Sequence, residues 1–104
     1  MPLNFYPIML RISLIESPVT GAVLHLEGQI AGAWTTELRD TCERVLAAGR
    51  PLTLDLGDVS LIDRQGFDLL DSLSLRNVTL ARCSPFQEEQ LRQLAAAHAV
   101  RTRP

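Results

Sequence analysis

The fold of this chain is decided by the stretch LTLDLGDVSLIDRQGF, residues 52–67. Its first five residues form an apolar run with the length of a buried strand. Gly57–Ser60 then has the composition of an acidic turn, and Asp63 is suited to start a short helix. This order places Asp63, Arg64 and Gln65 at the exposed beginning of a helix, on the rim where open α/β sheets bind ligands and partners.

Outward from this stretch, the residues on both sides divide into strand and helix patterns. Met9–Glu16 and Ala22–Ile30 alternate apolar and polar residues, which predicts a hairpin with one solvent-facing side. Residues 34–48 have helical periodicity, residues 78–81 suit a short strand, and residues 84–98 suit a final helix. The order β-β-α-β-α-β-α predicts an α/β fold, a single small domain with a mixed central β-sheet and parallel crossovers.

The helical segments also show which side should face the core. The apolar positions that share one side of the first helix are Trp34, Leu38, Cys42, Val45 and Leu46. Those expected to face inward from the helix after Asp63 are Phe67, Leu70 and Leu73. Asp68 and Asp71 should lie on the outer, solvated side of that helix.

The two ends of the chain differ in how they should be ordered. Ser84, Pro85 and Gln87 combine a capping residue, a proline at the first helical position and a glutamine that can cap in return. This pattern predicts a well-defined start for the last helix. Residues 1–8 are expected to be an N-terminal extension of the single domain 1–104, and residues 99–104 a flexible tail.

Composition excludes several classes of protein. The chain has 104 residues, a formal net charge of −2, ten basic residues that are all Arg, and no basic stripe of the kind that binds nucleic acid. No segment approaches the ~20 apolar residues of a membrane span, and the first residues lack the features of a secretory signal. We therefore expect a cytoplasmic protein without nucleic-acid binding or direct membrane insertion. Cys42 and Cys83 are expected to be buried free thiols.

The titratable residues form no recognisable active site in the sequence. His25 and His98 lie outside any motif with Ser or Cys, and with Cys42 and Cys83 they lack the spacing of metal ligands. Neither of the usual glycine-rich phosphate motifs is present. The acidic residues of the segment 55–71 suit a solvated face. We expect no enzyme activity, no cofactor and no metal site.

One constellation remains, an aspartate that precedes a helix with a glycine in its first turn. Asp63 can accept the free backbone N–H groups of that turn, and Gly66 allows another backbone to approach closely. On this turn and its surroundings, the chain resembles the STAS domain family of anti-anti-sigma factors and sulfate transporters. The resemblance runs from about Leu24 to Leu94, and the matching pieces are residues 24–30, 36–39, 54–63, 66 and 84–85. It implies a mixed sheet with helices packed mainly on one face.

The regulatory branch of that family carries Asp-Ser-Ser-Gly or a near variant in this loop. The resemblance implies that a partner kinase, which is also the anti-sigma factor, phosphorylates the hydroxyl just before the glycine. Here the loop reads Asp63-Arg64-Gln65-Gly66, so Gln65 is a degenerate phospho-acceptor position without a hydroxyl. The resemblance therefore implies a non-catalytic regulatory module that binds a protein partner but lacks the usual serine switch. The expected partner-binding residues are Asp58, Ser60, Asp63, Arg64, Gln65, Gly66, Phe67 and Asp68.

Two alternatives stay open at this point. Some small proteins that resemble this family are cytoplasmic accessory subunits of lipid-type ABC transporters, and the partner would then be the transporter ATPase. A small anion or a lipid headgroup is the second alternative, because the helix start after Asp63 is electropositive and Arg64 could pair with it. The apolar residues of the segment Leu3–Met9 could also cover an exposed patch, either in their own subunit or in a neighbouring one, and the second arrangement would make a homodimer.

Overall fold

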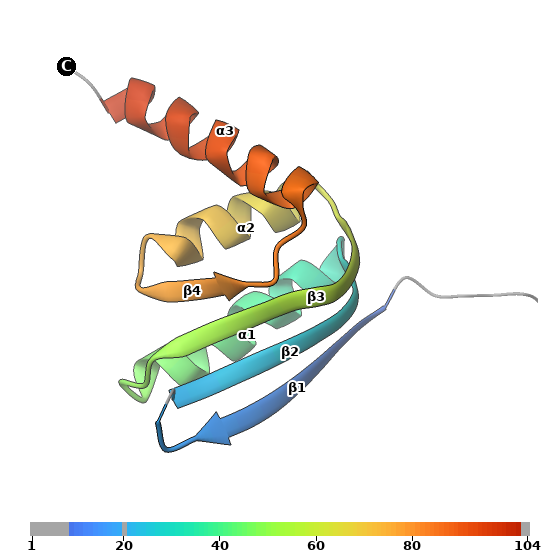
Figure 1. The fold of residues 1–104 in the computed structure, drawn as a ribbon, viewed down its shortest axis with the longest axis vertical. Helices are drawn as coiled ribbons and strands as arrows, with labels where there is room; N and C mark the ends of the chain where they lie inside the picture. Colours follow the sequence, from blue (N-terminus) through green and yellow to red (C-terminus); the bar gives the residue numbers. More distant parts are fainter. Residues whose placement is uncertain (1–8, 20, 103–104) are drawn as a thin grey trace, which may run out of the picture.

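The computed structural model describes residues 9–19 and 21–102, with residues 98–102 described by their backbone only. Along the chain the elements are β1 (Leu10–Ser17), β2 (Gly21–Ile30), α1 (Ala33–Ala47), β3 (Leu52–Ile62), α2 (Arg64–Ser74), β4 (Val78–Ala81) and α3 (Pro85–Thr102). This succession confirms the order predicted from the sequence (Figure 1).

The described strands form one mixed sheet in the order β1-β2-β3-β4. β1 pairs antiparallel with β2, as expected of a hairpin, whereas β2–β3 and β3–β4 are parallel pairs. Helices α1 and α2 are therefore the two crossover connections. Because β2 and β3 run in the same direction, both end at one edge of the sheet. Helices α1 and α2 begin there, within three residues of Ile30 and Ile62.

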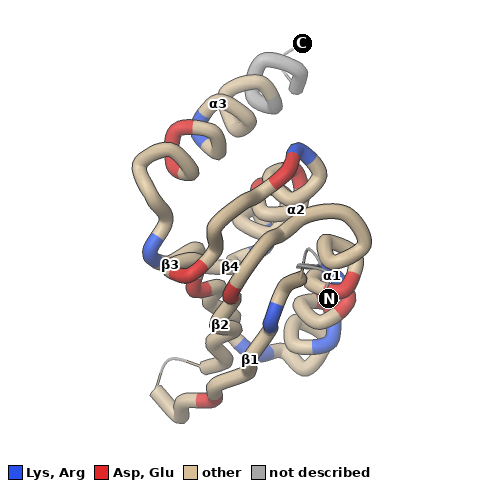
Figure 2. The backbone as a smooth tube through the Cα atoms, turned by 90° about the vertical axis from the view of Figure 1, so that its right-hand side faces the viewer, with Lys and Arg blue, Asp and Glu red and all other residues tan. Residues whose placement is uncertain are grey.

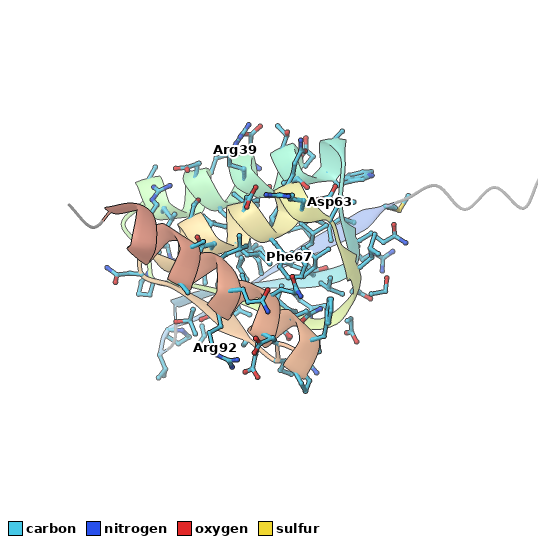
Figure 3. All side chains as sticks on the ribbon, turned by 90° about the horizontal axis from the view of Figure 1, so that it is seen from above. Arg39, Asp63, Phe67 and Arg92 are labelled. Carbon is cyan, nitrogen blue, oxygen red and sulfur yellow. The ribbon has the colours of Figure 1, made fainter. Side chains whose placement is uncertain are left out.

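Helices α1 and α2 lie over one face of the sheet, and α3 lies beside α2 (Figures 1 and 3). Strand alternation directs one set of side chains into the layer between sheet and helices, and the fully buried leucines of β2 and β3 are Leu24, Leu26, Leu52, Leu54 and Leu56. The helices contribute Leu38, Cys42, Leu70 and Leu73 to the same core. The expected α/β fold with a mixed sheet is thereby confirmed.

Strand β3 is longer than its sequence suggests. We expected a turn at Gly57–Ser60, but the strand continues through it to Ile62. The pairing with β2 slips twice, first between His25 and Glu27, and these two residues face Asp55 and Asp58. Between these two pairs β3 advances by three residues while β2 advances by two, so the acidic segment is a β-bulge. A glycine beside an aspartate suits both a bulge and a turn. Here the segment pairs with β2, which makes it a bulge.

The faces of α1 and α2 agree with the sequence pattern except at two positions. Asp71 was expected on the solvated side of α2, but only 3% of its surface is exposed. The reason is that α2 lies between α1 and α3, and Asp71 lines the hollow between α2, β4 and α3. Thr35, which the apolar pattern of α1 left out, is also buried. Both cysteines are free thiols as expected. Cys42 is buried in the core, which raises its pKa to about 12, whereas Cys83 is only partly buried.

The start of α3 is the predicted capping box. The Ser84 hydroxyl oxygen accepts the Gln87 backbone N–H at 3.1 Å, and the Gln87 side-chain oxygen accepts the Ser84 N–H at 2.9 Å. The helix runs to Thr102, beyond the expected end near His98, so most of the expected tail 99–104 is helical. Residues 1–8 lie outside the described residues, so of the apolar segment Leu3–Met9 that was expected to cover a patch, the structure describes Met9 alone. None of the described helices is long and apolar enough to cross a membrane.

Candidate functional site

Asp63 joins the beginnings of α1 and α2. One carboxylate oxygen accepts the backbone N–H of Gly66 at 2.7 Å, which caps α2, and the other accepts the N–H of Gly32 at 3.0 Å. Gly32 is the residue that precedes α1, and it has no side chain with which to cap that helix. The Asp63 N–H in turn donates to the Ile30 carbonyl at 3.1 Å. The predicted capping role of Asp63 is confirmed, and it extends to a second helix.

Gly66 is held where no larger residue fits. A Cβ atom built on it would lie 2.5 Å from the Ile30 carbonyl oxygen and 2.8 Å from a methyl carbon of Ile62. Both neighbours belong to the ends of β2 and β3, which cannot retreat without loosening the sheet. The glycine therefore lets α2 begin directly against the edge of the sheet, as its close-approach role predicted.

The side chains that follow Asp63 lie on either side of α2. Arg64 lines a groove between α2 and α3, together with Ile62, Phe67, Asp68, Gln90 and Leu94. Gln65 lines a groove of about 470 Å³ between α2 and α1, together with Thr35, Thr36, Arg39, Asp68, Leu69 and Ser72. We call this surface, residues 63–68 with Thr35, Thr36 and Arg39, the rim surface. Figure 3 shows Asp63 at the start of α2 and Arg39 on the neighbouring α1.

An apolar patch adjoins the rim surface. Ser60 and Phe67, both expected in the site, line one hollow with Leu61, Ser84 and Phe86 among its other residues. Leu61 is 48% exposed and Phe86 is 67% exposed, which is high for side chains of this size. The structure thus brings the predicted residues from Ser60 to Asp68 into one neighbourhood that spans the beginnings of α2 and α3.

Asp58 is the one predicted site residue that lies elsewhere. It belongs to the sheet face that the helices leave open, where its carboxylate is 3.0 Å from His25 Nε2. His25 Nδ1 is 3.1 Å from the Asp55 carboxylate, and the Glu27 carboxylate is 4.0 Å from Nε2. Arg82 donates to both Asp55 oxygens, at 2.8 and 2.9 Å. We call these residues, His25, Glu27, Asp55, Asp58 and Arg82, the open-face cluster.

The hydrogen bonds of the open-face cluster shift the pKa values of Asp55 and His25. The two hydrogen bonds from Arg82, helped by the Gly57 N–H and His25, hold the pKa of Asp55 well below its usual range. The hydrogen bond to Asp55 raises the pKa of His25 above 6.5, and the charges of Asp55, Asp58 and Glu27 act in the same direction. Along the rest of the backbone, Arg positions and Asp or Glu positions are intermixed, as Figure 2 shows.

Two groups of residues were missed by the sequence reasoning. Thr35, Thr36 and Arg39 reach the site only because α1 and α2 begin at the same sheet edge, and the Thr35 hydroxyl is buried without a hydrogen-bond partner in the described structure. His25 and Asp55 are 30 residues apart. The alternation of β2 and β3 indicates that both face away from the core, and a parallel pairing of the two strands would have placed them side by side.

Comparison with known proteins gives a consistent picture of the fold. A family model described as the STAS domain matches residues 11–103. Among solved structures, the chain is similar to the crystal structure of an anti-sigma factor antagonist from Mycobacterium paratuberculosis. That similarity has a TM-score of 0.73 and 16% sequence identity, and it covers 90% of this chain and 85% of the other. No curated protein matches the sequence.

Proposed function

The chain belongs to the STAS domain family, and we propose that it is a non-catalytic regulatory module that binds a protein partner in the manner of an anti-sigma factor antagonist. The anti-sigma factor antagonist from Mycobacterium paratuberculosis shares the fold. The observation that carries the proposal is the arrangement at Asp63. One carboxylate fixes the starts of two helices, and Arg64 and Gln65 remain exposed beside it.

The rim surface suits a protein partner better than a small molecule. Its grooves are open to solvent, and the apolar patch with Leu61 and Phe86 continues the surface beyond them. Protein interfaces combine an apolar centre with a polar border of this kind, and Arg is enriched in them. A small anion is less favoured at the start of α2, because the Asp63 carboxylate already accepts two backbone N–H groups there and would repel it.

We further propose that binding at the rim surface is not switched off by phosphorylation. The position at which the family's regulatory branch carries the acceptor hydroxyl is Gln65, whose amide cannot be phosphorylated. Phosphate would otherwise add about −1.5 to −2 units of charge to the surface. The module would therefore bind its partner constitutively, or under control exerted on the partner.

The first experiment measures binding to each anti-sigma factor of the source organism, expressed separately, by calorimetry. Arg64→Ala,Gln65→Ala should weaken the complex by at least about tenfold, because interface arginines often contribute over 1 kcal/mol. The matched control is Arg92→Ala,Gln93→Ala, which removes the same pair of residue types from exposed positions of α3, away from the rim surface. If no anti-sigma factor binds but a transporter ATPase does, with the same loss in the rim variant, the module is a transporter accessory instead.

The second experiment restores the missing hydroxyl. With the bound kinase partner and ATP, intact mass should show no phosphate on the natural sequence and one phosphate on Gln65→Ser, whose complex should then dissociate. Stoichiometric phosphate on the natural sequence, for example on the exposed Ser60 or Ser72, would overturn the claim that the switch is lost. Ser60→Ala and Ser72→Ala identify which hydroxyl carries it.

A further inference from the structure

The open-face cluster has the composition of a metal site as well as that of an ion-pair network. The ligand atoms of His25, Glu27 and Asp58 all lie within 4.8 Å of one another. Metal bonds of about 2.0–2.2 Å at tetrahedral angles place ligand atoms about 3.3–3.6 Å apart. The distances from His25 Nε2 to the two carboxylates, 3.0 and 4.0 Å, fall on either side of that separation.

The bulge in β3 creates this arrangement. Glu27 faces Asp58 across the β2–β3 pair, although a regular strand would put the residue two after Asp55 at that position. The extra residue is Gly57, and a Cβ atom there would lie 2.3 Å from the Arg82 guanidinium carbon. Bulges often serve to redirect a side chain next to a functional site. Here the bulge directs Asp58 toward the imidazole.

The second feature is the way in which His25 is oriented. Its Nδ1 faces Asp55, and Asp55 is itself fixed by Arg82 and by the Gly57 N–H at 3.0 Å. A neutral imidazole that donates Nδ1–H to this carboxylate presents the lone pair of Nε2 to the two remaining carboxylates. Histidines that bind metals in proteins are almost always held by such an outer carboxylate or carbonyl.

The charge balance also favours a cation. With neutral His25, three carboxylates and one guanidinium leave the open-face cluster with two uncompensated negative charges, which a divalent ion would neutralise. Glu27 and Asp58 have side chains that are 42% and 56% exposed, so an ion can enter and water can complete its coordination. One imidazole and two carboxylates suit Zn²⁺ and its first-row neighbours better than Mg²⁺ or Ca²⁺.

We propose that His25 Nε2, Glu27 and Asp58 bind a divalent ion of the zinc class, with Asp55 as the outer partner that orients His25. This departs from the expectation of no metal site, which compared only histidine and cysteine spacings. The site lies on the open face of the sheet, opposite the helices, and does not depend on the function proposed for the rim surface.

The test is calorimetric titration of the chelator-treated full chain with ZnCl₂. The natural sequence should bind one ion per chain with a Kd below about 1 mM. Asp55→Asn should weaken binding by about 10–100-fold, and Asp58→Asn or His25→Ala should weaken it further. His98→Ala removes the other histidine and serves as the matched control, and Cys83→Ser removes a competing thiol. The substituted cluster residues are partly exposed, and circular dichroism checks that each variant is folded.

Two results would overturn the proposal. One is the absence of saturable binding, and the other is binding that His25→Ala and Asp58→Asn leave unchanged. In either case the open-face cluster is a closed ion-pair network around a protonated His25. Co²⁺ gives an independent readout, because its visible absorption should appear on binding and change when His25 is replaced but not when His98 is.

Discussion

Asp55 follows a buried residue of β3 and Asp63 follows a partly buried one at the end of that strand. Each accepts a backbone N–H close by in the sequence. Beyond that their partners differ. Asp63 accepts a second backbone N–H, that of Gly32, and so fixes the chain at the start of two helices. Asp55 instead accepts hydrogen bonds from side chains, those of Arg82 and His25.

This difference separates two uses of a carboxylate. At the rim, both carboxylate oxygens of Asp63 accept backbone N–H groups. The side chains that remain free to bind a partner are those of its neighbours Arg64 and Gln65. On the open face, Asp55 orients the His25 side chain, and its contact with the backbone is local, to the Gly57 N–H two residues later. Changes at the rim should therefore affect folding, whereas changes in the open-face cluster should affect titration and ion binding.

The largest effect should come from the glycines of the two regions. Gly66→Ala should lower the free energy of unfolding by about 2–3 kcal/mol, because its Cβ would meet the Ile30 carbonyl in a packed layer. Gly57→Ala should leave that free energy nearly unchanged, because its Cβ meets the end of the flexible Arg82 side chain. Urea unfolding of both variants measures the difference. If both lost the same free energy of unfolding, the rim would not be more important for folding than the open face.

The next effect concerns the two-helix cap. Asp63→Ala should cost about 1–2 kcal/mol of unfolding free energy, because the N–H groups of Gly66 and Gly32 both lose their acceptor. Asp63→Asn should cost less, because its amide oxygen can still cap α2 while its NH₂ group faces the Gly32 N–H. Hydrogen exchange at these two amides tests the assignment. Protection that persists at Gly32 in Asp63→Ala would show that another group holds the start of α1.

The smallest effect on stability, and the clearest on titration, concerns His25. Its folded-state pKa is raised above 6.5, so its stabilising contribution is complete below that pH and is lost as the pH rises through the folded-state value. Asp55 behaves oppositely, because its lowered pKa makes its contribution disappear only in acid. An NMR titration of the imidazole should show a lower pKa in Asp55→Asn than in Glu27→Gln, since the Asp55 hydrogen bond is the largest cause.

The sequence predicts the features whose causes lie within a few residues. The Ser84 capping box, the capping role of Asp63 and the close approach at Gly66 all belong to this class, and all were confirmed. Asp71 was placed wrongly, because the burial of that side of α2 depends on α3, which comes later in the chain. The bulge at Gly57 was taken for a turn, because only the pairing with β2 distinguishes the two.

The two regions of the site differ in the same way. The residues from Asp63 to Asp68 could be proposed from a single segment, and the structure keeps them together with Ser60. The open-face cluster combines β2, β3 and Arg82, which follows β4, so no local pattern marks it. Asp58 was assigned to the rim for that reason, because the slip in register that turns it toward His25 cannot be read from the order of residues.

The bulge in β3 has a consequence for how such a chain can change over evolutionary time. The inward positions of the strand are Leu52, Leu54 and Leu56, and the next is Val59. Without Gly57 the regular alternation would continue into Val59 unbroken. An insertion or deletion of this one codon would therefore keep every apolar side chain on its own side. Because the extra residue covers no additional distance along β2, the Asp63 turn would also stay in place. A lineage could thus gain or lose the bulge in one genetic step, without rebuilding the core or moving the rim surface.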